Sequence, residues 1–140
     1  DGITLCILSR GLADVYKRQE VYDYSNIEVT IDEQGVFKVT MNESLAVALL
    51  TNLLKNAFVH NIDGGHIRIT VTKNGITFRN SGVEHPLNKE HIFERFYQGS
   101  KKEGSTGLGL AIADSICRLQ HLNIKYYFEQ NEHCFEISQS

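Results

Sequence analysis

The sequence predicts an α+β protein, a two-layer sandwich in which a mixed, largely antiparallel sheet carries its helices on one face. The 140 residues are 41% hydrophobic and 22% charged, which suits one globular domain with an ordinary core. Short alternating apolar and polar runs, typical of strands, occur in neighbouring pairs joined by turn residues. Two longer segments with apolar residues at helical spacing separate these pairs, in the order β-β-α-β-β-loop-α-β-β.

The first nineteen residues are expected to lie outside the native domain. The string SRGLADVYKRQ at 9–19 resembles the translation of a sequencing-library adapter, and a genuine basic connector is the alternative. We expect no helix or strand before Glu20. We therefore assign residues 1–19 to a non-native segment and residues 20–140 to the domain.

The first half of that domain is expected to contain a hairpin and a long helix. Residues 27–31 and 36–41 alternate around a glycine, as the two strands of a hairpin do. Asn42 or Ser44 can cap the helix that follows, which runs to about His60. Strands at 66–72 and 75–80 then flank a Lys-Asn-Gly turn, a strong hairpin signal.

The second half begins with a long polar loop at 81–106, inside which we expect a short helix near 88–97. A second amphipathic helix is predicted from Gly107 to His121. The chain closes with strands at 123–128 and 133–137.

Charge and cysteine content exclude several functions. Seventeen acidic against fourteen basic residues, with no basic tract, disfavour binding to nucleic acid through its phosphates. No apolar run approaches the roughly 18 residues that span a bilayer, so we expect no membrane contact for this segment. The three cysteines are widely spaced and form no CxxC pair, as expected for small buried side chains in a reducing compartment.

Four short segments could carry chemistry. Asn52, Asn56 and His60 recur every four residues, so they share one stripe of the first helix. Amide oxygens suit Mg²⁺ that also binds phosphates, although contacts with strands or solvent explain the asparagines equally well. A glycine-rich run at 104–110 leads into the second helix. Glycines let the backbone approach a ligand closely, and the free N–H groups at a helix start attract phosphate. The run lacks the lysine of a P-loop and does not closely follow a strand.

The other two segments are weaker alone. Asn80, at a strand end, can recognise the edge of a base, but Asn-Ser-Gly is also ordinary turn chemistry. The stretch IFERFY at 92–97 places aromatic residues in a polar loop. These residues suit either a lid that docks on a ligand or a small cluster that holds the loop down.

Together, and in this order, the segments resemble the ATP-binding catalytic domain of sensor histidine kinases. This domain belongs to the superfamily of gyrase, Hsp90 and MutL ATPases. The N box is similar to residues 52–60, the first Gly box to 80–82, the F box to 93–96 and the second Gly box to 104–112. The resemblance implies a Bergerat-type sandwich that holds ATP and Mg²⁺ between the N-box helix and a lid.

The resemblance also implies roles for individual residues. Asn56 would ligate Mg²⁺, Arg95 would lie near the phosphates, and Phe93 and Phe96 would anchor the lid. With Asn56 and Arg95 as the catalytic residues, the implied nucleotide-binding residues are Asn52, Asn56, His60, Asn80, Gly82, Phe96, Gly104, Ser105, Thr106, Gly107, Leu108, Gly109 and Leu110.

Three positions depart from the family pattern. Asn80 stands where the family usually has an aspartate that accepts a hydrogen bond from adenine, and an amide oxygen can still accept it. Glu84 replaces a glycine and Val59 a lysine. We expect these changes to weaken the affinity for ATP more than they alter the fold.

The residue one turn before Asn56 bears on the type of reaction. ATP hydrolases and serine kinases of the superfamily commonly carry a glutamate there as general base, and Asn52 cannot take a proton. This favours transfer of the γ-phosphate to a histidine over hydrolysis or serine phosphorylation.

None of the six histidines lies in an acceptor-like helix. We therefore expect the acceptor on an upstream or partner domain, a response regulator as the further partner, and a cytoplasmic location within a membrane-anchored kinase. The alternative is a degenerate module that binds nucleotide, or none, and acts by docking on a partner.

Overall fold

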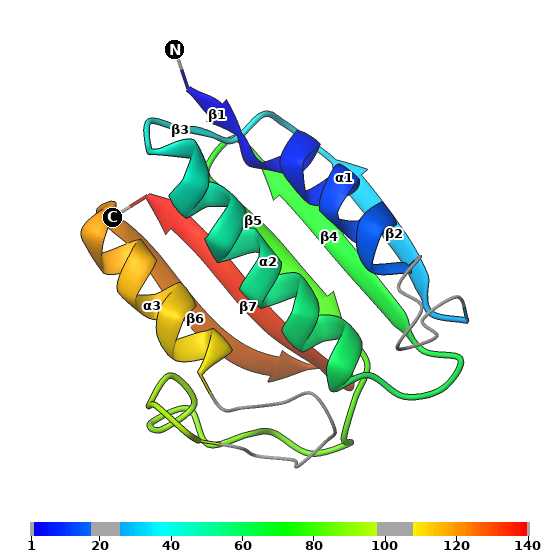
Figure 1. Cartoon of the computed structure of the whole chain (residues 1–140). Helices are drawn as coiled ribbons and strands as arrows, with labels where there is room; N and C mark the ends of the chain where they lie inside the picture. Colours follow the sequence, from blue (N-terminus) through cyan, green and yellow to red (C-terminus); the bar gives the residue numbers. More distant parts are fainter. Residues whose placement is uncertain (1, 18–25, 98–107, 140) are drawn as a thin grey trace.

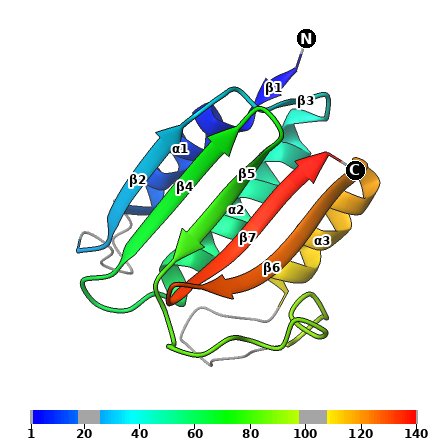
Figure 2. The ribbon, with the colours of Figure 1, turned by 180° about the vertical axis from the view of Figure 1, so that it is seen from behind.

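The computed structural model describes residues 2–17, 26–97 and 108–139 (Figure 1). Within them, a five-stranded sheet carries three helices on one face, and no helix covers the other face (Figure 2). The predicted α+β sandwich is confirmed. No helix of the described residues is both long and apolar enough to cross a membrane.

The sheet has the strand order β2-β4-β5-β7-β6. The strands are β2 (Glu28–Glu33), β4 (His66–Thr72), β5 (Gly75–Asn80), β6 (Leu122–Glu129) and β7 (Glu132–Gln139). The predicted β4–β5 and β6–β7 hairpins are confirmed, and β5 pairs with β7, all three antiparallel. Among the described strands, β2 alone pairs in parallel, with β4.

The two predicted helices are also present. Helix α2 (Glu43–Val59) begins after Asn42, whose side-chain oxygen accepts a hydrogen bond from the Leu45 amide at 3.2 Å. Helix α3 (Gly109–Leu119) packs beside α2 over the same face of the sheet (Figure 1). The C-terminal half of α2 and the start of α3 carry residues of the site described below.

The predicted hairpin of residues 27–31 and 36–41 is wrong. Strand β2 joins β4 instead, and the Gln34 amide extends that ladder by donating to the Val71 carbonyl at 2.8 Å. Strand β3 (Lys38–Val39) pairs with β1 (Ile3–Thr4). Alternation of apolar residues predicts that a segment is a strand but does not identify its partner.

The expectation of no element before Glu20 is also wrong. Helix α1 spans Leu5–Lys17, and its apolar residues recur at helical spacing. Leu5, Cys6 and Ala13 are buried in the core, where α1 packs against α2. The origin of residues 9–19 remains a prediction.

The segment 88–97 forms a series of turns in place of the expected short helix. The amides of His91, Glu94 and Tyr97 each donate to the carbonyl three residues earlier. The Asn88 side chain accepts from the Glu90 amide, which competes with helical bonding. Phe96 has a φ of 65°, and this left-handed conformation cannot occur within a right-handed helix.

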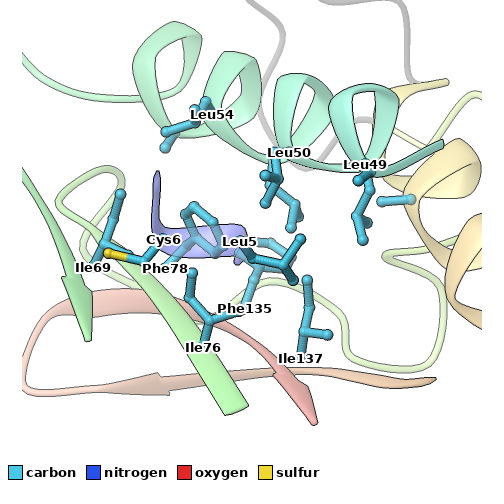
Figure 3. Packing of buried hydrophobic residues seen from close by; sticks show 14 of the residues in the cluster. Leu5, Cys6, Leu49, Leu50, Leu54, Ile69, Ile76, Phe78, Phe135 and Ile137 are labelled. Atoms are coloured by element: carbon cyan, nitrogen blue, oxygen red, sulfur yellow. The ribbon is translucent and has the colours of Figure 1, made fainter. Parts of the chain in front are cut away.

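The core lies between the helices and the sheet (Figure 3). Leu49, Leu50 and Leu54 of α2 are fully buried and face the inward side chains of the sheet, which include Ile69, Ile76, Phe78, Phe135 and Ile137. All three cysteines are free and buried, as predicted. This packing fixes α2 over β5 and β7, the elements that carry the site.

Candidate functional site

A pocket lies where the C-terminal half of α2, the end of β5, the 83–97 segment, the start of α3 and β7 meet. It is a shallow pocket, and its empty space, the open mouth included, is about 490 Å³. Its lining residues are Asn56, His60, Asn80, Val83, Leu87, Ile92, Tyr97, Leu110, His133 and Phe135.

Asn80 provides the pocket with a fixed hydrogen-bond acceptor. Its side chain is 2% exposed, and its Nδ2 donates to the Ser81 carbonyl at 2.8 Å. Since only a donor can satisfy that carbonyl, the orientation of the amide is determined. Its Oδ1 is buried without a hydrogen-bond partner among the described residues. Such an atom is destabilising by about 1–3 kcal/mol until it accepts a bond, as it can from the amino group of a ligand.

The asparagine stripe of α2 divides between two environments. Asn56 and His60, one turn apart, line the pocket. Asn52 is absent from the lining: its Nδ2 donates to the Ala48 carbonyl at 2.8 Å, and its Oδ1 faces the first residue of α3. A Cβ on Gly109 would lie 3.1 Å from this oxygen, so the glycine allows the close approach of the two helices.

The start of α3 is one wall of the pocket. Leu110 contributes to the lining, and the cap residue Leu108 makes no side-chain hydrogen bond to the first turn. The N–H groups of that turn are therefore not capped by the residue preceding the helix. The remaining predicted residues of the second glycine segment, Gly104, Ser105, Thr106 and Gly107, lie outside the described residues.

The two phenylalanines of the F-box-like segment behave differently. Phe93 is partly buried and makes an edge contact with Phe135, with ring centroids 6.2 Å apart. Phe96 is 65% exposed and carries the Arg95 guanidinium 5.3 Å from its ring centre. Neither Arg95 nor Phe96 lines the pocket, and of the two phenylalanines it is Phe93 that packs against the sheet.

Gly82 allows two histidines to approach the pocket. A Cβ at this position would lie 2.9 Å from the His60 carbonyl oxygen and 3.1 Å from His133 Cδ2. Both distances are shorter than ordinary van der Waals contact, so a larger residue would displace one of the histidines. Gly82 therefore acts through its neighbours and is absent from the lining itself.

Sequence reasoning missed His133, which is 4% exposed and hydrogen-bonded through both ring nitrogens. Its Nδ1 lies 2.7 Å from the Tyr126 hydroxyl, and its Nε2 lies 2.7 Å from the Val83 carbonyl. Burial lowers the pKa of His133. The available signal was the alternation of β7, which turns residues 133, 135 and 137 to the same inner face.

Comparison with known proteins agrees with this architecture. Residues 41–138 match the family described as histidine kinase-, DNA gyrase B-, and HSP90-like ATPase. The sensor histidine kinase RppB of Synechocystis sp. is 37% identical over 123 residues, covering 80% of this chain and 27% of that protein. The heme sensor protein HssS of Staphylococcus aureus is 40% identical over 90 residues, covering 61% and 20%. The chain thus spans about a quarter of the length of these relatives.

Solved structures show the same fold. The catalytic domain of histidine kinase ThkA superposes with a TM-score of 0.82 at 24% identity, covering 98% of this chain and 92% of that one. The mycobacterial sensor histidine kinase MprB gives a TM-score of 0.78 at 18% identity, covering 98% and 94%. Fold, pocket and the match over most of the chain agree, and the chain belongs to the family of histidine kinase-, DNA gyrase B- and HSP90-like ATPases.

Proposed function

We propose that this domain binds ATP with Mg²⁺ and donates the γ-phosphate to a histidine on a separate phosphoacceptor domain. The observation that carries the proposal is the buried Oδ1 of Asn80, which has no hydrogen-bond partner in the part of the chain that the structure describes; Asn80 lines a pocket that Asn56 and His60 also line. Adenine presents an amino group that can donate to such an oxygen. Membership of an ATPase family supports the same ligand.

The other site residues divide between base and phosphates. Asn56 would supply an amide oxygen to Mg²⁺, which, when bound, offsets the charge of the phosphates. His60 would lie beside the nucleotide. Leu108, Gly109 and Leu110 begin α3, where backbone N–H groups favour phosphate, and Gly104–Gly107 would extend this contact. Arg95 and Phe96, in the turns before residue 98, would approach the nucleotide from the lid.

Transfer is favoured over hydrolysis by Asn52. Its amide nitrogen already donates to the Ala48 carbonyl, and neither end of an amide can accept a proton from water at neutral pH. Transfer to an imidazole needs positioning and charge stabilisation more than a base. A solved structure of ThkA in complex with a response regulator, and the similarity to the sensor histidine kinase RppB, support a histidine acceptor and a response regulator as partners. We place this activity on the cytoplasmic side of a membrane-anchored kinase.

The decisive experiment is isothermal titration of the full chain with ATP, with and without Mg²⁺. We expect binding that Mg²⁺ strengthens, and Asn56→Ala should remove that strengthening. Asn123→Ala is the matched control, because Asn123 is exposed on the outer face of β6, far from the pocket. A folded wild-type chain that binds no ATP would contradict the proposal and favour the docking module.

A second assay tests the transfer step. The chain is mixed with labelled ATP and the histidine-containing acceptor domain of a sensor kinase, and label on the acceptor is measured. We expect label on the acceptor with wild type and Asn123→Ala, and none with Asn56→Ala. Release of inorganic phosphate from ATP at equal rates with and without the acceptor domain would instead indicate an ATP hydrolase.

A further inference from the structure

We propose that His133 and Tyr126 are positioning residues that hold segment 83–87 as one wall of the nucleotide pocket. The inference rests on the proposed function, since the wall positions a ligand only if the pocket binds one. Val83 and Leu87, at the two ends of the segment, both line the pocket, and both are hydrogen-bonded to this pair. Glu84, His85 and Pro86 between them are exposed.

The donors and acceptors of this network can be assigned from its chemistry. The Val83 carbonyl only accepts, so His133 Nε2 carries the hydrogen and donates across 2.7 Å. In a neutral imidazole the other nitrogen, Nδ1, then accepts from the Tyr126 hydroxyl at 2.7 Å. The Tyr126 oxygen in turn accepts from the Leu87 amide at 3.0 Å. One chain of three hydrogen bonds therefore connects both ends of the segment to the β6–β7 hairpin.

The surroundings keep both side chains in these protonation states. Burial lowers the pKa of His133, and the Val83 carbonyl opposes this effect. Titratable groups near the ring include Tyr126, His60, which lines the same pocket, and His85, whose charge also lowers the pKa of His133. Burial raises the pKa of Tyr126, so its hydroxyl stays protonated and available as a donor.

Aromatic packing fixes the two rings on the inner face of the hairpin. His133 stacks on Tyr126 with centroids 5.9 Å apart and contacts Phe128 at 4.8 Å. Tyr126 also packs on Phe135, with ring centroids 5.1 Å apart, and Phe135 contacts Phe93 in the turns at 88–97. The absence of a side chain on Gly82 leaves room for the His133 ring. The hydrogen-bonding atoms are thus held by closely packed rings on the inner face of the sheet.

Tyr126→Phe tests the network by removing one oxygen atom. Tyr127→Phe is the matched control, because Tyr127 is the next residue of β6, lies on the outer face and is hydrogen-bonded to Glu136. Two quantities are measured: hydrogen exchange of the Leu87 amide without nucleotide, and the dissociation constant for ATP. We expect Tyr126→Phe to accelerate the exchange and weaken ATP binding about fivefold to tenfold, the effect of one lost neutral hydrogen bond. Tyr127→Phe should change neither.

A rescue experiment separates positioning from packing. In His133→Gln the amide nitrogen is as many bonds from Cβ as Nε2 and can donate to Val83, whereas His133→Leu cannot donate. We expect His133→Leu to weaken ATP binding at least tenfold and His133→Gln to remain within about threefold of wild type. Equal losses in the two variants would overturn the assignment of His133.

The outcomes distinguish this inference from the proposed function. If the wild-type chain binds ATP and Tyr126→Phe binds it equally well, the inference fails while the proposed function stands. If the folded wild-type chain binds no ATP, the proposed function fails, and the inference fails with it. Faster exchange at Leu87 together with weaker ATP binding, in Tyr126→Phe alone, supports both.

Discussion

The nitrogen and the oxygen of the Asn80 amide lie in different environments. The nitrogen donates to the Ser81 carbonyl, and the oxygen has no hydrogen-bond partner among the described residues, in a side chain that lines the pocket. A base that presents an amino group satisfies this oxygen, whereas a base that presents a carbonyl places two acceptors against each other. The site should therefore discriminate strongly between such bases.

We expect wild type to bind ATP at least tenfold more tightly than ITP, in which an oxygen replaces the amino group of adenine. A binding site that leaves a buried polar group unpaired rejects the wrong ligand by such factors or more. Asn80→Ala should reduce the preference below about threefold, and Asn123→Ala should preserve it. Competition of the two nucleotides for a fluorescent ATP analogue measures the ratio. Equal affinities in wild type would contradict the assigned orientation of Asn80.

The sequence predicted part of this site because helical spacing is a local property. Asn56 and His60 were placed together by their distance along one helix, and both line the pocket. Asn52 has the same spacing, but it lies against the start of α3 and does not line the pocket. His133 could not be placed, because its partner Val83 is 50 residues away in the chain.

Strands β4 and β7 are connected across β5 on the outer face of the sheet. Arg68 of β4 donates two hydrogen bonds to Glu132 of β7, at 2.6 and 2.9 Å, and His66 lies 2.6 Å from the same carboxylate. Glu132 is 5% exposed although it is outside the core. These hydrogen bonds, those of Arg68 foremost, lower the pKa of Glu132.

Arg68→Leu should lower the free energy of unfolding by about 1–2 kcal/mol, because it leaves a buried carboxylate with one partner fewer. The expected loss is smaller than for a fully buried pair, because the Arg68 side chain is half exposed to solvent. Arg118→Leu breaks the exposed pair with Asp114 and should change the free energy of unfolding by less than about 0.5 kcal/mol. Urea denaturation of both variants and wild type at pH 7 measures the difference. Equal changes in the two variants would contradict a role for the buried pair.

The same pair predicts a dependence on pH. Because the folded pKa of Glu132 lies below the ordinary value of 4.5, the unfolded chain binds the proton more readily. The stabilisation by Glu132 is complete above about pH 4.5 and is lost as the pH falls through the folded pKa. Arg68→Leu should show a shallower loss of stability over that range than wild type does.

The antiparallel hairpins were predictable from sequence and the parallel pair was not. Each hairpin joins strands that follow one another directly, as Thr72 and Gly75 do in β4–β5. The partner of β2 is set by the inward side chains of the whole sheet and by the position of α2, which no short segment encodes. The turns at 88–97 were not predictable, because a phenylalanine gives no sequence signal for the left-handed conformation that Phe96 adopts.

Helix α1 lies on the side of α2 opposite α3 (Figure 1), away from the pocket. Leu5 is 0% exposed and Ile7 is 69% exposed, so the two residues form a matched pair on one helix. Leu5→Ala should lower the free energy of unfolding by about 2–5 kcal/mol, and Ile7→Ala by less than about 1 kcal/mol. Chemical denaturation measures both.

ATP affinity should remain within about twofold of wild type in both variants, because the pocket contains no residue of α1. This expectation accords with our proposal that residues 20–140 are the functional unit. Small and equal effects on unfolding would show that α1 does not dock as described. A loss of affinity in folded Leu5→Ala would contradict the independence of the pocket from residues 1–19.

The parallel pairing of β2 with β4 also determines the order in which the sheet is completed. The β4–β5 and β6–β7 hairpins need only a short loop to close, so they can form early in folding. Strand β2 meets His66 and its neighbours only after the chain has passed through all of α2, and such non-local contacts form slowly. Strand β2 is an edge strand bonded to β4 alone among the described strands, so we expect it to join the sheet after the two hairpins have formed. A force applied at the amino end would act first on β1 and α1 and then on β2, none of which lines the pocket between α2, β5 and β7.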